Sequence, residues 1–154
     1  MFRLAARQFI VAPREAALRT RMACWVVLIS IVARLTSLPR AQRMACAGTR
    51  SRSARARVAP EALAAAIDGV LGMELFVFHR SCWKRAMVLQ RFLTFNGIES
   101  RINFGVQKTS DGTVNGHAWL EYQGQPFLEP DAGTYVVTFS LPLEAATGGE
   151  RSAG

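Results

Sequence analysis

Apolar residues recur at helical spacing in the middle of the chain, and the spacing changes to that of strands after Gly97. Residues 60–72 follow the helical period, and Pro60 suits a first helical turn because that turn needs no N–H group there. Residues 82–95 are apolar on nearly every side and end shortly before Gly97, which can form a left-handed cap. The pattern therefore predicts two helices, and we expect the second to be central and buried.

Short runs rich in aromatic and β-branched residues follow, separated by sequences typical of turns. We interpret these runs as antiparallel strands at residues 100–107, 116–123, 125–130 and 134–141. Helices followed by a strand meander are typical of an α+β domain, which is the fold class that we predict.

The N-terminal part of the chain predicts helices of its own. One begins at Pro13, and a second, shorter one ends at Gly48. The apolar run at residues 22–33 has 12 residues, whereas a helix that crosses a bilayer needs about 20. We therefore expect a buried or partner-facing helix that is too short to span a membrane, with a peripheral membrane helix or an export signal as alternatives.

Arginine is concentrated in the N-terminal third. Residues 1–60 hold 12 arginines and one acidic residue, whereas the remainder holds 7 basic and 10 acidic residues. The formal charge of +8 therefore comes from residues 1–60. Residues 61–154 are mildly acidic, so we do not expect nucleic acid as their partner. Residues 48–60 combine four arginines with small residues and lack an apolar period, which is typical of a linker or an exposed loop.

These patterns divide the chain into three parts. Residues 1–57 form an Arg-rich helical region and linker, and residues 58–142 form the main folded domain. Residues 143–154 contain no core-forming side chains, and we expect them to be disordered.

The three cysteines are too irregularly spaced for a disulfide framework or a paired-cysteine zinc site. Only two histidines are present, so we predict no metal site, and we expect a reducing, cytosolic environment. Cys24 and Cys46 are expected to be small buried apolar residues, because neither has a polar helix start beside it. His79 is expected to be a surface or loop residue, with a second base as the alternative.

Cys82 differs because it follows Ser81 at the expected start of the buried helix. A helix N-terminus carries partial positive charge and free N–H groups, which stabilise a thiolate and can bind an oxyanion. A thiol nucleophile requires a general base, and His117 begins a strand 35 residues later. We interpret Cys82 as the nucleophile, with a buried apolar residue as the alternative.

Two neighbouring residues have two interpretations each. Trp119 shares the face of His117 and either packs over the imidazole or contacts substrate. Arg85 either forms a salt bridge or contributes to the site.

A third polar group normally orients such an imidazole. A hairpin that turns at Gly124 would bring the strand ending with Glu129 and Asp131 beside the strand of His117. We expect Glu129 to be the orienting carboxylate and keep Asp131 as the alternative third member.

At these residues the chain resembles the transglutaminase-like cysteine peptidases of lasso-peptide biosynthesis, and the resemblance is strong over about residues 60–131. The positions that match the family's pattern are Cys82, Arg85, Gly97, Gly105, Val106, His117, Ala118, Trp119, Glu121 and Gly124. The family generally has Asp where this chain has Glu129. The resemblance implies a transglutaminase-like (papain-like) core with an N-terminal helical extension.

The resemblance also implies a reaction, its partners and a location. The reaction is removal of the leader peptide from a ribosomally made lasso precursor peptide, through a thioester at Cys82 with His117 as base and without a cofactor. The implied partners are a separate leader-binding recognition protein and an ATP-dependent macrolactam synthetase similar to asparagine synthetases, in the cytoplasm, with an exporter or the inner face of the membrane as a further contact. Two other functions remain open: a non-catalytic adaptor that tethers a peptide-maturation complex, and a transglutaminase-like acyltransferase, since a thioester accepts amines when water is excluded.

Overall fold

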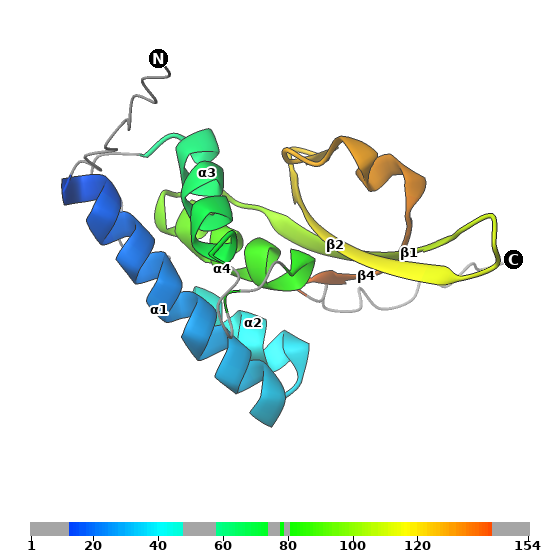
Figure 1. Ribbon diagram of the computed structural model, residues 1–154, viewed down its shortest axis with the longest axis horizontal. Coiled ribbons are helices and arrows are strands. Elements are labelled where there is room, and N and C mark those ends of the chain that lie inside the picture. The colour runs from blue at the N-terminus through cyan, green and yellow to red at the C-terminus, as the bar shows by residue number, and fades with distance from the viewer. Residues whose placement is uncertain (1–12, 48–57, 74–77, 79–80, 143–154) are drawn as a thin grey trace, which may run out of the picture.

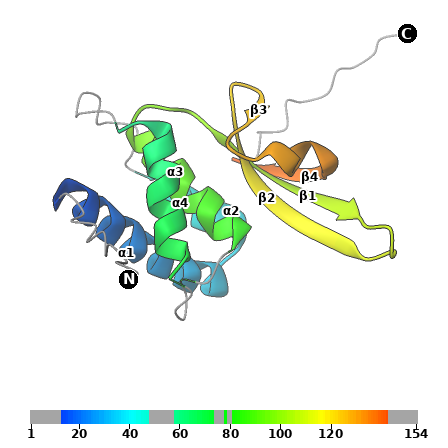
Figure 2. The ribbon, with the colours of Figure 1, turned by 45° about the horizontal axis from the view of Figure 1, so that its top comes forward.

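The computed structural model describes residues 13–47, 58–73, 78 and 81–142. Its helices gather at one end, and a long hairpin extends away from them (Figure 1, Figure 2). The helices are α1 (Pro13–Leu35), α2 (Leu38–Cys46), α3 (Pro60–Leu71) and α4 (Cys82–Phe95). The strands are β1 (Arg101–Lys108), β2 (Val114–Tyr122), β3 (Gln125–Pro126) and β4 (Val136–Leu141), with the 3-10 helix η2 (Pro130–Thr134) between the last two. Helices followed by an antiparallel sheet confirm the predicted α+β class.

α4 is the central helix that the sequence predicts. Eight of its residues are buried, among them Met87, Leu89 and Leu93. Gly97 follows the helix with φ +76°, the left-handed conformation that favours glycine at a helix end. The glycine signal at the C-terminal end of this helix therefore agrees with its observed end.

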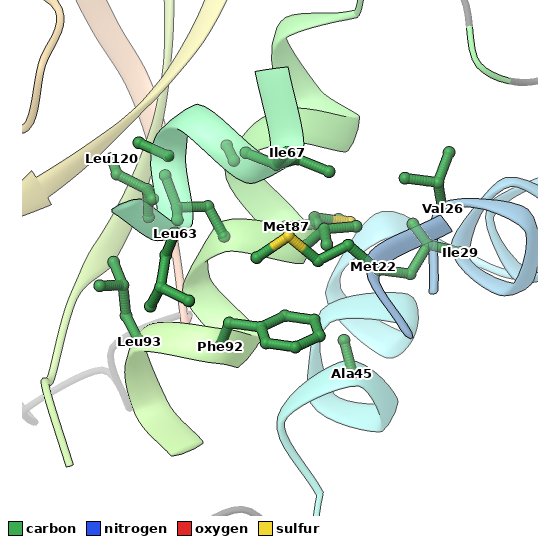
Figure 3. Close-up of a cluster of buried hydrophobic side chains, with 14 of the residues drawn as sticks. Met22, Val26, Ile29, Ala45, Leu63, Ile67, Met87, Phe92, Leu93 and Leu120 are labelled. Atoms are coloured by element: carbon green, nitrogen blue, oxygen red, sulfur yellow. The ribbon is translucent and has the colours of Figure 1, made fainter. Parts of the chain in front are cut away.

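α1 contributes a stripe of buried residues to the core. Met22, Val26 and Ile29 are each at most 2% exposed and lie at helical spacing. Figure 3 shows them gathered near Met87 and Phe92 of α4, within one hydrophobic cluster. The burial agrees with the expected buried helix.

α1 begins at Pro13, as the sequence predicts, but it is longer than the 12-residue apolar run from which its ability to span a membrane is judged. The helix has 23 residues and is, by length and composition, apolar enough to cross a membrane, so the expectation that it is too short to span is wrong. The difference arises because Arg, Ala and Leu on either side of the apolar run are good helix formers and continue the helix beyond it.

The buried amides of the helical part are paired. Gln42 of α2 donates to the side-chain oxygen of Gln90 of α4 at 3.0 Å, and Gln90 donates to the carbonyl of Ser100 at 2.9 Å. A buried amide without partners would cost free energy, so these bonds allow two glutamines to lie inside the core and fix α2 against α4.

The predicted division of the chain at residue 57 falls outside the described residues, as do the tail at 143–154, His79 and all but the last three residues of the linker predicted at 48–60, of which Pro60 is the first residue of α3. Helices on both sides of residue 57 nevertheless belong to one hydrophobic cluster, because α1 and α2 pack with α3 and α4. The described helices therefore form one folded unit with the sheet.

The sheet has the order β3-β2-β1-β4, and all neighbouring strands are antiparallel. Three of its strands lie within a few residues of the predicted runs at 100–107, 116–123 and 134–141. Gly124 makes the expected turn, with φ +74°, after Gln123 with φ +51°.

The predicted strand at residues 125–130 is shortened to the two residues of β3. Pro126 has no N–H group to donate to a ladder, and Phe127 makes one more bond, to the carbonyl of Leu120 at 2.8 Å. Leu128 then adopts φ +54°, which turns the chain away from the extended conformation. Glu129 consequently lies in an irregular segment rather than on a strand.

Candidate active site

Cys82 is the first residue of α4 and is half-buried. Ser81 occupies the N-cap position, but its side chain makes no capping hydrogen bond. The first N–H groups of a helix have no acceptor within the helix, so the start of α4 keeps donors and partial positive charge for an anion. This is the local setting that a reactive thiol requires.

His117 lies on β2 opposite Gly105 of β1, with a side chain that is 25% exposed. Its ring stacks with Trp119, with centroids 5.9 Å apart and planes 15° apart. Tyr135, directly after η2, makes a tilted contact with the same imidazole at 5.1 Å and lies 6.1 Å from the Trp119 ring. Packing of Trp119 against the imidazole, one of its two interpretations, is therefore confirmed, and contact with substrate stays a prediction.

The Trp119 ring lies over Gly105. A Cβ atom at Gly105 would stand 2.8 Å from Cη2 and 2.9 Å from Cζ3 of Trp119, and 2.9 Å from the carbonyl oxygen of Val136. These separations are shorter than the contact distance of carbon atoms, so only glycine leaves room for the ring. His117 shares the face of β2 with Trp119, and its position therefore depends on this packing.

Glu129 approaches His117 from the segment between β3 and η2. Its Oε2 lies 3.5 Å from Nε2 of His117, and its Oε1 accepts a hydrogen bond from Nη1 of Arg85 at 2.7 Å. The imidazole contact is longer than an ordinary N–H···O bond, yet it directs Nε2 toward the carboxylate and leaves Nδ1 for another partner. The side chain of Asp131, the alternative carboxylate, lies outside the described residues.

Arg85, one turn after Cys82 on α4, links Glu129 to α3. Its Nε and Nη2 donate to the two carboxylate oxygens of Asp68 at 2.6 and 3.2 Å. Burial would lower the pKa of Arg85, but the hydrogen bond to Asp68 and the charges of both carboxylates raise it above its ordinary value. Arg85 is therefore a fixed cation that forms salt bridges on both sides.

The structure brings three predicted residues, His117, Glu129 and Arg85, into one chain of contacts. α4 also packs against β2, which places Cys82 and His117 on neighbouring elements. The contacts of the described residues do not include a hydrogen bond between the Cys82 thiol and His117.

No sequence pattern points to two further residues of this cluster. Asp68 occupies an ordinary polar position of an amphipathic helix, and Tyr135 belongs to an aromatic run like the others in the sheet. Only the packing of α3 and the return of the chain through η2 bring them to the site.

The other cysteines lie on the helices of the N-terminal part. Cys24 is exposed, so its expected burial is wrong; it lies on α1 between Met22 and Val26, off the buried stripe. Cys46 is half-buried, with its sulfur 3.6 Å from the side-chain oxygen of Gln90.

The described part of the chain holds no group of three or more His, Cys, Asp or Glu side chains suited to a metal ion.

Comparison with known proteins places this site in a family. Searches among curated proteins and among solved structures find no significant match. The model of the transglutaminase-like superfamily, however, matches residues 25–140, a range that covers most of the chain and contains Cys82, His117 and Glu129. The chain therefore belongs to the transglutaminase-like superfamily.

Proposed function

We propose that this chain is a cysteine peptidase that removes the leader peptide from a ribosomally made lasso precursor peptide. The transglutaminase-like superfamily includes cysteine proteases and acyltransferases. The observation that carries the proposal is the contact of Glu129 with Nε2 of His117, on a strand that packs against the helix beginning with Cys82. The lasso precursor is suggested by the sequence resemblance around the same residues.

The proposed reaction proceeds through a thioester. Nδ1 of His117 takes the proton of the Cys82 thiol, and the thiolate attacks the carbonyl carbon at the leader–core junction. N–H groups at the start of α4 stabilise the oxyanion of the tetrahedral intermediate. When the C–N bond breaks, His117 gives its proton to the departing core amine. Water, deprotonated by His117, then hydrolyses the thioester, which releases the leader carboxylate and restores the thiol.

Cys82→Ala and His117→Ala are each expected to abolish leader removal and leave the protein folded. Nucleophile and base act as one unit, so losing either is nearly as damaging as losing both. The measurement is mass spectrometry of the precursor after incubation with the protein and its complete partner set, with circular dichroism as the check on folding.

Cys24→Ser and Cys46→Ser are the matched controls, and both should process the precursor at the wild-type rate. Processing that survives Cys82→Ala would contradict the mechanism and favour a non-catalytic adaptor. A leader joined to an added amine, rather than a free leader acid, would identify an acyltransferase.

The proposal includes partners and a location. A separate recognition protein would hold the leader, and an ATP-dependent macrolactam synthetase would use the core amine that cleavage releases. The assembly would work in the cytoplasm. If an exporter is part of it, the assembly would lie at the inner face of the membrane. The 12 arginines of residues 1–60 offer the charge for docking, because guanidinium groups bind carboxylates bidentately and speed association.

A further inference from the structure

Glu129 lies between β3 and η2, outside any strand or helix, and its backbone carbonyl accepts one hydrogen bond, from the N–H of Ala132 at 3.2 Å, which leaves its side chain to be placed by other contacts. β3 before it has two residues, Leu128 has φ +54°, and η2 begins immediately after it. Side-chain contacts must therefore hold the carboxylate in place. Its short contact, 2.7 Å, is with Arg85, whereas its contact with His117 is 3.5 Å. A charge-assisted bond at the shorter distance is the stronger of the two.

Arg85 is itself fixed from the other side. It belongs to the buried helix α4, its side chain is only 17% exposed, and Asp68 of α3 accepts two of its N–H groups. The guanidinium group is planar and its N–H bonds have fixed directions. The pair of bonds to Asp68 therefore also sets the direction of Nη1, which points to Glu129.

We propose that Arg85, held by Asp68, is a positioning residue that sets the place of Glu129 and, through it, the orientation of the His117 imidazole. The role rests on the proposed function, because it concerns the same site. Arg85 acts through Glu129 and takes no part in the bonds that form and break. The ion pairs Asp68–Arg85 and Arg85–Glu129, which we call the brace, hold the Glu129 carboxylate of an irregular segment in a fixed place relative to the packed helices α3 and α4.

Two other roles for Arg85 make different predictions. A salt bridge that only joins α3 to α4 would change stability and leave the site's chemistry unaltered once the protein is folded. A cation that acts directly on the Cys82 thiolate, one turn away, would act whether or not Glu129 is present. A positioning residue loses its effect when the Glu129 carboxylate is already absent, because nothing is left to position.

The test is the rate at which iodoacetamide alkylates Cys82 in the folded full-length chain, followed by mass spectrometry of the Cys82 peptide. Alkylation requires thiolate, so under the proposed function the rate reports whether His117 activates the Cys82 thiol, and it does so without precursor or partners. Arg85→Gln and Glu129→Gln are each expected to slow alkylation by about tenfold. The double variant should be no more than about twofold slower than either single variant. The exposed Cys24 is an internal reference whose rate should not change.

Milder variants keep the test decisive if Arg85→Gln does not fold. Arg85→Lys should give an intermediate rate, because an ammonium group lacks the fork that holds two carboxylates. Asp68→Asn should also give an intermediate alkylation rate, and its effect should vanish in the Glu129→Gln background.

Arg91→Gln is the matched control on the same helix, because Arg91 contacts other residues: it lies over the Trp25 ring and donates a hydrogen bond to the carbonyl of Ala45. Its Cys82 rate should equal that of wild type.

Additive effects of Arg85→Gln and Glu129→Gln would overturn the positioning role, and so would a wild-type rate in a folded Arg85→Gln protein. His117→Ala separates this failure from failure of the proposed function. If His117→Ala leaves the Cys82 rate unchanged, the thiol does not use the imidazole, and the proposed function falls together with the brace. If His117→Ala slows alkylation and the two other effects are additive, only the positioning role is overturned.

Discussion

At the scale of single residues, the missing side chain of Gly105 determines where Trp119 can lie. Gly105→Ala would put a methyl group 2.8 Å from the Trp119 ring and 2.9 Å from the carbonyl oxygen of Val136. The backbone oxygen cannot rotate away, and the ring is in contact with His117 and Tyr135. We expect the free energy of unfolding in urea to fall by about 1–3 kcal/mol. Under the proposed function, leader removal should slow by roughly tenfold to a hundredfold, because a small displacement of His117, the proposed base, would be costly.

Gly116→Ala is the matched control for this steric argument. Gly116 precedes His117 on the same strand, but a Cβ atom there would meet only the carbonyl oxygen of Gly105, at 4.0 Å. Its free energy of unfolding should stay within about 0.5 kcal/mol of wild type. Equal losses for the two alanine variants would show that glycine flexibility, rather than the space above Gly105, is what matters.

The local sequence pattern predicts the positions of some residues of the site but not of others. Cys82 stands at a helix start and His117 in a strand after a turn, so the cap and turn residues nearby indicate where both side chains lie. Glu129 follows a turn glycine by five positions, which makes its return toward His117 predictable although its register is not. Asp68 and Tyr135 reach the cluster only through the packing of distant segments, which no local pattern encodes.

At the scale of elements, burial within α1 follows its periodicity rather than the length of its apolar run. The run at residues 22–33 marks where the helix is most apolar, but the buried positions are Met22, Val26 and Ile29. Leu28 and Ile31 lie within the same run and are 43% and 51% exposed. Hydropathy alone therefore could not predict either the 23-residue length or the side of the helix that faces the core.

Ile29 and Ile31 provide a matched pair that tests the placement of α1. Ile29→Ala removes a side chain that is 2% exposed, and it should lower the free energy of unfolding by about 2–5 kcal/mol. Ile31→Ala changes an exposed position and should cost less than about 0.5 kcal/mol. Urea denaturation followed by circular dichroism measures both. If the two variants were equally stable, α1 would not be a core helix, and a peripheral membrane helix would be the better interpretation.

The sheet was predictable wherever side chains and turns specify it. β1, β2 and β4 carry aromatic and β-branched residues, and Gly124 specifies the hairpin between β2 and β3. The early end of β3 depends on the positive φ of Leu128, a conformation that is uncommon for a residue with a side chain. A sequence pattern rarely predicts such a residue, and here it is the one that turns the chain toward Glu129.

At the scale of the whole molecule, charge and packing divide the chain differently. The arginines separate residues 1–60 from the acidic remainder, whereas the hydrophobic cluster joins α1 and α2 to α3 and α4. Deleting residues 1–57 would remove Met22, Val26 and Ile29 from the core, at a cost of about 1.5–3 kcal/mol for each side chain. Together these losses, about 4.5–9 kcal/mol, are a large share of the total stability of about 5–15 kcal/mol that a domain of this size has, so the deletion would confound any binding measurement with loss of the fold. A test of what the N-terminal arginines bind must therefore use surface substitutions in the full chain.

Arg14, Arg40 and Arg43 are exposed on α1 and α2 and suit that test. Replacing all three with Gln should leave the fold intact. Under the proposed function it should weaken binding of the proposed leader-recognition protein by about tenfold at low salt, because exposed charges contribute modestly and mainly speed association. The difference from wild type should shrink as salt screens the charges. Pull-down at two salt concentrations measures the binding, and flotation with anionic vesicles measures membrane attachment on the same samples.

Lys108→Gln, at the far end of the β1–β2 hairpin, is the control for loss of charge elsewhere. Unchanged binding of the recognition protein in the triple variant would rule out docking through these arginines, and a loss of flotation alone would assign them to the membrane surface instead.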